Sequence, residues 1–103
     1  MSSLRYNVIY RNGNKVPVEI ADFYRTDGGR FVFEYVENPE YEFPGFGASE
    51  RKFESDHLWE QISFRVPNYV RNQFPNFPPE ELLQKTGGKL VTDHFEFQFA
   101  GSL

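Results

Sequence analysis

The first 36 residues contain three stretches in which apolar and polar side chains alternate, and a turn signal separates each stretch from the next. RYNVIYR (5–11), KVPVEIADFYR (15–25) and RFVFEYV (30–36) are separated by NGN and TDGG. Side chains that alternate with a period of two lie on opposite faces of a β-strand. An Asn-Gly pair favours a tight two-residue turn because such a turn requires positive φ angles. The sequence therefore predicts an antiparallel meander of three strands.

The three predicted strands share one apolar face. In the third strand this face carries Phe31, Phe33 and Tyr35, and in the second we expect Val16, Val18 and Ile20 on one face, opposite Glu19. Pro17 cannot donate a hydrogen bond to a neighbouring strand. We therefore expect the second strand to lie at an edge, or its proline to point outward.

Residues 37–54 form a long segment without periodicity that is rich in Pro, Gly and aromatic residues. Its rings are Tyr41, Phe43, Phe46 and Phe53. The favoured interpretation is that these rings hold a loop over the open edge of the sheet. The alternative is functional, since long ordered loops often carry binding sites, and here the loop would close over an apolar pocket.

The second half of the chain predicts two short helices and a final strand. Ser55 or Asp56 is expected to cap a helix that ends before Pro67, and residues 68–77 read as irregular. PPEELLQKTGG (78–88) predicts a second helix with an early proline and a glycine C-cap at Gly87. We expect the apolar face of the first helix to contain Leu58, Trp59, Ile62 and Val66. The apolar face of the final strand (93–99) is expected to contain Phe95, Phe97 and Phe99.

Taken together, these elements predict a single α+β domain over residues 1–103. We expect a small, curled, barrel-like antiparallel sheet with one or two short helices covering one side or end. Twelve Phe residues provide a large apolar area for a small core.

Composition excludes several classes of function. The chain has no Cys, which rules out disulfides, thiol catalysis and Cys-based metal sites. A net charge of −4 without a basic stripe argues against direct nucleic-acid binding. We find no signal peptide and no apolar stretch long enough to span a membrane. These features predict a cytoplasmic protein.

No arrangement of residues predicts catalysis or a cofactor. His57 and His94 are the only imidazoles and are far apart in the sequence, so a metal site is not expected. Ser55, Asp56 and His57 have the residue types of a nucleophilic site, but consecutive residues point in different directions. The Gly-rich turns lack the context of a phosphate-binding loop. The chain is therefore not expected to be an enzyme or to bind a cofactor.

Several motifs nevertheless resemble those of one family. A third strand with the pattern F-x-Y is followed by FPGF, then by SDHLWEQISFRVPN with YVR after it, and finally by LLQKTGGKLVTDHFEF. The most specific parts are PGF (44–46), the L-W-x-x-I-x-x-R-V-P run (58–67) and TGGKLVTD (86–93). In this order and spacing, over residues 8–97, they resemble the N-terminal subdomain of HipA-type serine/threonine kinases, and most closely its free-standing HipS-like version.

This resemblance implies a fold and a function. The fold is a small antiparallel, barrel-like sheet with a helix. HipS-like proteins are antitoxins that restrain a HipA- or HipT-like kinase toxin, in complexes that also contain a helix-turn-helix HipB-like repressor. The kinase chain carries the ATP-binding and catalytic residues of that family. The alternative function, from the residues alone, is a small aromatic-lined ligand-binding domain or a small enzyme.

Four residues are the candidates for contact with the kinase: Phe46, His57, Trp59 and Arg71. At the position of Trp59 the family commonly has Phe or another large apolar residue. Trp59 either packs on the sheet with Leu58 and Ile62 or turns outward into the kinase, and we favour the second because Trp is enriched at interface hot spots. For Arg65 we favour an interaction with the helix dipole over a kinase contact; for Arg71 neither interpretation is favoured.

Overall fold

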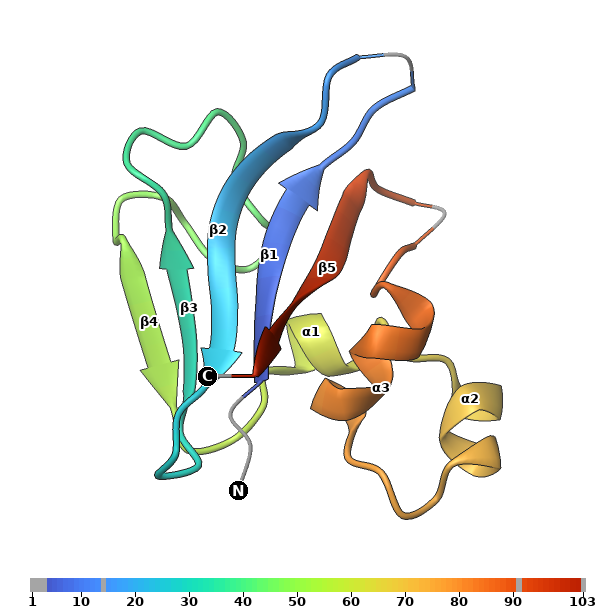
Figure 1. The fold of residues 1–103 in the computed structure, drawn as a ribbon. Helices are drawn as coiled ribbons and strands as arrows, with labels where there is room; N and C mark the ends of the chain where they lie inside the picture. Colours follow the sequence, from blue (N-terminus) through green and yellow to red (C-terminus); the bar gives the residue numbers. More distant parts are fainter. Residues whose placement is uncertain (1–3, 14, 91, 103) are drawn as a thin grey trace.

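The computed structural model describes residues 4–13, 15–90 and 92–102, which form one antiparallel sheet and a group of short helices (Figure 1). The strand order in the sheet is β4-β3-β2-β1-β5. The elements along the chain are β1 (Leu4–Tyr10), β2 (Val18–Arg25), β3 (Phe31–Tyr35), β4 (Lys52–Ser55), α1 (Glu60–Ser63), α2 (Asn68–Gln73), α3 (Pro79–Thr86) and β5 (Phe95–Ser102). The predicted α+β class is confirmed.

The predicted meander corresponds to β1, β2 and β3, which pair antiparallel in sequence order. Residues 11–17 connect β1 to β2, and the predicted Asn-Gly turn lies within this connection, where Gly13 has a φ of +60°. Lys15 donates its backbone N–H to the carbonyl of Asn12 at 3.1 Å, and Asn14, part of the predicted turn, lies outside the described residues. The expectation for Val16 is wrong. The strand pairing ends at Tyr10 and Val18, so Val16 lies beyond it and is 81% exposed.

Pro17 immediately precedes β2, and its side chain is exposed. It therefore removes no hydrogen bond from the sheet, although β2 lies in the interior of the sheet between β1 and β3. The apolar face of β3 is confirmed, since Phe31, Phe33 and Tyr35 are all buried.

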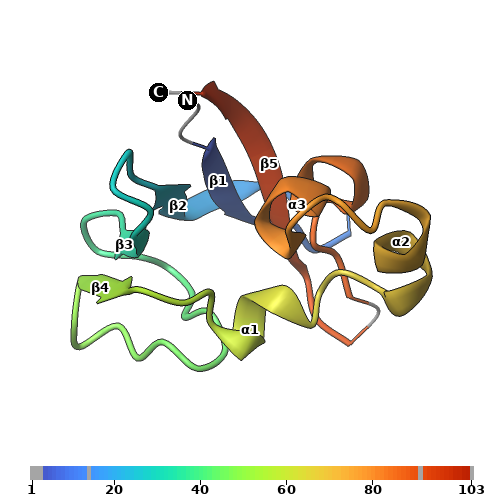
Figure 2. The same ribbon diagram turned by 90° about the horizontal axis from the view of Figure 1, so that it is seen from below.

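The sheet is strongly curved and stays open. Figure 2 shows the five strands as an arc, with α1 and α3 on its concave side. β4 and β5 form the two edges and do not pair with each other, so the sheet is curled like part of a barrel. Aromatic side chains fill the space between sheet and helices; the fully buried ones include Tyr6, Phe23, Phe33, Tyr35, Phe43 and Phe97.

β5 completes the sheet by pairing with β1, as its alternating pattern predicts. Phe95 and Phe97 are buried, but Phe99 is 42% exposed, so the expected apolar face is only partly covered. Phe99 retains an edge contact with the ring of Tyr6, at 5.7 Å between centroids.

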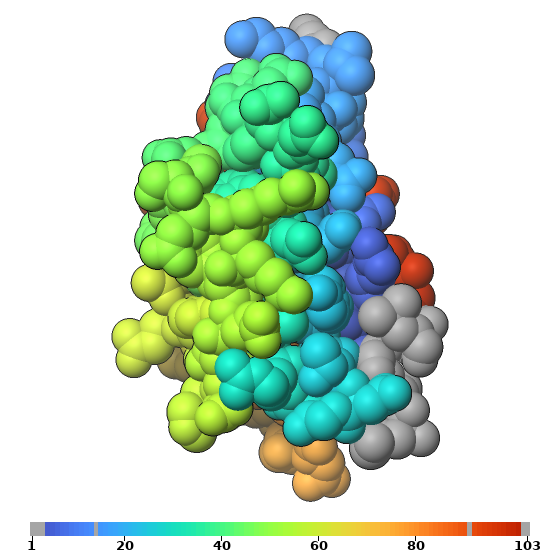
Figure 3. Space-filling model, turned by 90° about the vertical axis from the view of Figure 1, so that its left-hand side faces the viewer, coloured from blue at the N-terminus to red at the C-terminus, as the bar shows by residue number. Residues whose placement is uncertain are grey.

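The segment 37–54 contains a strand that its composition does not indicate. β4 pairs with β3, and Phe53 lies opposite Phe33. The flanking Lys52 and Glu54 are exposed, and charges of this kind discourage further strand pairing at an edge. The rest of the segment extends over the β4 side of the molecule, where its green atoms are visible in Figure 3.

The helices differ from the prediction in number and limits. The expected helix from Ser55 or Asp56 to Pro67 is replaced by α1, which has only four residues and begins at Glu60. Tight turns follow it, since Arg65 and Val66 donate their N–H groups to carbonyls three residues earlier. The region 68–77, expected to be irregular, contains α2. α3 and its left-handed Gly87 C-cap agree with the prediction.

Ser55 and Asp56 have other partners, which explains the late helix start. The Ser55 hydroxyl accepts a hydrogen bond from the backbone N–H of His57 at 3.0 Å, and Asp56 pairs with Arg30 at 2.5 Å. Trp59 occupies the N-cap position in extended conformation, without a side-chain hydrogen bond.

A substitution at Gly88 tests how tightly α3 and β5 pack. Gly88 has a φ of +63°, and a Cβ there would lie 2.8 Å from a ring carbon of Phe97. We expect Gly88→Ala to lower the free energy of unfolding by roughly 2–5 kcal/mol, because left-handed backbone strain and overpacking add. Urea denaturation measures this change in the free energy of unfolding.

Gly13→Ala is the matched control. Gly13 has a similar φ of +60° but no atom within 4 Å of the added Cβ, so only the backbone strain of about 1–2 kcal/mol applies. Equal losses in the two variants would contradict the close packing at Gly88.

Candidate functional site

The candidate site is the helical segment, defined here as residues 58–77, which connects β4 to α3. It contains α1 and α2 and no strand. Its inward side is held by a few apolar residues, of which Ile62, Val66 and Val70 are buried. Because the two helices are too short to be stable alone, the orientation of this segment depends on its contacts with the rest of the domain.

Arg65 supplies the strongest of these contacts. Its side chain is 1% exposed and forms a bidentate pair with Asp93, with N–O distances of 2.5 and 3.2 Å. The guanidinium also donates to the carbonyl of Gly88 at 3.0 Å and lies 4.5 Å from the centroid of the Phe43 ring. Arg65 therefore joins the helical segment to the α3–β5 connection and to the segment 37–54.

The interpretation of Arg65 as a partner contact is thus corrected. Its charge is paired inside the domain and is not available to acidic groups on a partner. Arg65 directly follows the C-cap residue of α1, and its Nε donates to the carbonyl of Gln61 in that helix at 3.3 Å, in line with the favoured interaction at the helix terminus. The partner Asp93 is 28 residues away, so spacing along the chain does not reveal the pair.

Arg71, in α2, connects the two helices of the segment. Its guanidinium donates to the backbone carbonyls of Ser63 and Val66, which lie at and after the end of α1 and have no partner within that helix. Together with Glu60 and Phe64 it lines a groove of about 540 Å³ between α1 and α2. The prediction that Arg71 contacts a partner stays a prediction, and the structure gives it a role within the chain as well.

Trp59 and Phe46, two of the four candidate residues, lie together. Their rings meet edge to face at a centroid distance of 5.0 Å. Phe46 is 3% exposed and stacks on Phe33 at 4.5 Å, so it supports Trp59 from the core. Trp59 itself is half-buried. The indole packs against the hydrophobic core and keeps part of its surface exposed, and the prediction that it contacts a partner stays a prediction.

Hydrogen bonds to the Tyr35 hydroxyl hold the PGF turn, and with it Phe46, in this position. The hydroxyl of Tyr35 donates to the carbonyl of Phe46 and accepts a hydrogen bond from the backbone N–H of Phe43 at 2.9 Å. Burial raises the pKa of the Tyr35 hydroxyl, so the hydroxyl keeps its proton and remains a donor at neutral pH. Phe43 and Phe46 fill the core, in line with the interpretation that the rings hold the loop on the sheet.

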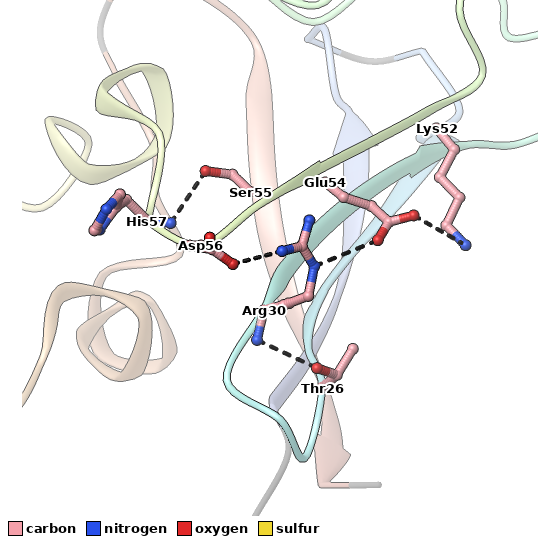
Figure 4. A network of polar contacts seen from close by, with 7 residues as sticks. All are labelled: Thr26, Arg30, Lys52, Glu54, Ser55, Asp56 and His57. Atoms are coloured by element: carbon pink, nitrogen blue, oxygen red, sulfur yellow. Dashed lines mark hydrogen bonds and ion pairs between the residues drawn. The ribbon is translucent and has the colours of Figure 1, made fainter.

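His57 lies apart from the other candidate residues. Figure 4 shows its ring pointing away from a surface network in which Arg30 contacts Asp56 and Glu54. Ser55 bonds to the backbone N–H of His57, and no interaction joins the three side chains of Ser55, Asp56 and His57 in this network. The structure therefore does not assemble these consecutive residues into a nucleophile–base pair.

Exposed aromatic side chains are the feature of this site that sequence reasoning missed. In the described part of the chain, five large apolar side chains are exposed, and three belong to the helical segment: Phe64 at 58%, Tyr69 at 68% and Phe77 at 47%. The spacing gave a signal for Phe64 alone, since at helical spacing Phe64 lies opposite the face that contains Ile62 and Val66, whereas Tyr69 falls on that face. Exposed apolar side chains that gather in one region indicate a binding surface.

Within residues 4–13, 15–90 and 92–102, no group of three or more His, Asp or Glu side chains could hold a metal ion. None of the described helices has the length and apolar character needed to cross a bilayer. Comparisons with protein-family models, curated proteins and solved structures find no match.

The buried pair of Arg65 and Asp93 can be tested through stability. We expect Asp93→Asn to lower the free energy of unfolding by about 3–5 kcal/mol, because it leaves a buried guanidinium without its counter-charge. Asp56→Asn is the control, since Asp56 pairs with Arg30 at the surface, with side-chain exposures of 73% and 47%. We expect Asp56→Asn to lower the free energy of unfolding by less than about 1 kcal/mol. Similar small losses in both variants would contradict the structural role of Arg65.

Proposed function

We propose that this chain is an antitoxin that binds a HipA- or HipT-like serine/threonine kinase and suppresses it. The observation that carries the proposal is that Phe64 and Tyr69 are exposed and Trp59 is half-buried on a helical segment that Arg65 and Arg71 hold in place. Aromatic residues dominate interface hot spots, and a segment fixed before binding loses little conformational entropy on association. The motifs around this segment are also those that resemble the HipS-like family.

Suppression then works through occupancy. The helical segment would insert its aromatic side chains into a hollow of the kinase, with Trp59 as the central contact and Phe46 behind it. The part of the indole that faces outward becomes buried in the complex. The place on the kinase that the segment contacts decides how suppression works. The segment either blocks the kinase cleft or stabilises a state of the kinase that does not bind substrate.

The partners follow from the same proposal. The chain acts in the cytoplasm, in a complex that contains the kinase and a helix-turn-helix HipB-like repressor. Its own net charge of −4 is unfavourable for binding DNA phosphates, so operator contacts belong to the repressor. The chain itself supplies no catalytic group and no cofactor.

Trp59→Ala tests the proposal. We expect the variant to remain folded while its Kd for the HipA-type kinase encoded in the same operon rises about 30-fold or more, which corresponds to roughly 2 kcal/mol at an interface hot spot. Calorimetry measures Kd, and growth after co-expression reports suppression of the kinase. Val16→Ala is the control, because Val16 is exposed on the β1–β2 connection, away from the helical segment; its affinity should equal that of the wild type.

Two outcomes would contradict the proposal. If the wild-type chain neither binds the kinase nor restores growth, the chain is not its antitoxin. If Trp59→Ala unfolds the isolated domain, the indole is a core residue and not the central contact.

A further inference from the structure

A second groove lies between α2 and α3. The two helices are neighbours in Figures 1 and 2, and the groove has a volume of about 400 Å³. Its lining includes Val70 from α2, Phe74 directly after that helix and Lys85 from α3, together with Tyr69 and Lys89. It is separate from the contact of Trp59 with Phe46, because none of the lining residues takes part in that contact.

The charges that line this groove have one sign. Lys85, Lys89 and Arg65 contribute, and none of the nine residues that line it is acidic. This is unusual in a chain with a net charge of −4. The groove between α1 and α2 is different, since Glu60 and Arg71 there have opposite charges.

Two of the three cations lack a strong partner within the domain. Arg65 is neutralised by Asp93. In the described part of the chain Lys85 forms no ion pair, and its ammonium lies 4.5 Å from the centroid of the Phe74 ring. Lys89 is 62% exposed and approaches Glu96 only to 3.9 Å, and exposed pairs of this kind contribute little. About two positive charges therefore face a ligand in the groove.

The groove also offers apolar surface. Val70 is buried at its base, Phe74 is half-buried, and Tyr69 is 68% exposed at the margin. Because Tyr69, Lys85 and Lys89 are exposed, a ligand would be covered from one side only. This fits a segment of a protein chain better than a small molecule, which usually has most of its surface buried in its pocket.

We propose that the groove between α2 and α3 binds an acidic segment of the partner kinase that carries an apolar side chain. This inference rests on the proposed function and names the chemistry of a second contact beside Trp59. A carboxylate of the segment pairs with Lys85 and Lys89, and its apolar side chain packs between Tyr69 and Phe74. Complementary charge of this kind accelerates association and fixes the relative orientation of two proteins.

A synthetic peptide of alternating Glu and Leu residues, with a Gln-for-Glu version as its counterpart, tests the groove directly. Titrated into the full 15N-labelled chain, the Glu peptide should shift the amide signals of Val70, Phe74 and Lys85, and added salt should weaken its binding. The Gln peptide should bind about tenfold more weakly. Equal binding of the two peptides, or shifts confined to other regions, would overturn the inference.

Charge-reversal variants provide a second test of the groove. The double variant Lys85→Glu/Lys89→Glu should weaken binding of the Glu peptide and of the kinase about tenfold. Lys15→Glu/Lys52→Glu has the same net charge but alters exposed lysines of the β1–β2 connection and β4, so it should leave both affinities within about twofold. An equal loss of affinity in both double variants would mean that only the net charge of the chain matters, and this would overturn the groove proposal.

The two proposals fail in different ways. If Trp59→Ala abolishes kinase binding and Lys85→Glu/Lys89→Glu does not change it, the antitoxin function stands and the groove proposal falls. If the wild-type chain binds the Glu peptide through the groove but binds no kinase, the proposed function falls, and with it the kinase as the source of the acidic segment.

Discussion

The buried guanidinium of Arg65 is the interaction on which the arrangement of this domain depends. It contacts Asp93, the carbonyl of Gly88 and the ring of Phe43, so three segments that are distant in the sequence meet at one side chain. A buried charge is tolerated only when its partners satisfy it. The requirement to keep Arg65 paired therefore fixes the end of α1 against the α3–β5 connection.

This constraint determines which side chains face outward. α1 and α2 have four and six residues and could turn freely without Arg65 and the capping contacts of Arg71. With both in place, Ile62, Val66 and Val70 point inward, and Phe64 and Tyr69 remain exposed. The exposure of these aromatic side chains thus follows from how polar groups are satisfied inside the domain.

Strands β1, β2, β3 and β5 and helix α3 could be predicted from the sequence, whereas β4, α2, the limits of α1 and the contacts between distant segments could not. The alternation in β1, β2, β3 and β5 and the cap of α3 are local signals that need no knowledge of neighbours. β4 has four residues in a segment rich in Pro and Gly, and it forms because Phe53 lies opposite Phe33. Ser55 and Asp56 resemble caps, but His57 and Arg30 engage them instead. At the candidate site, the contact of Trp59 with Phe46 likewise depends on tertiary packing.

Hydrogen–deuterium exchange of the full chain, alone and with the HipA-type kinase, tests most directly whether the helical segment is the docking surface. We expect slower exchange in residues 58–77 and in α3, and unchanged exchange in the turn 26–30 and in β4. Protection confined to that turn and β4, with the helical segment unaffected, would show that the kinase docks elsewhere.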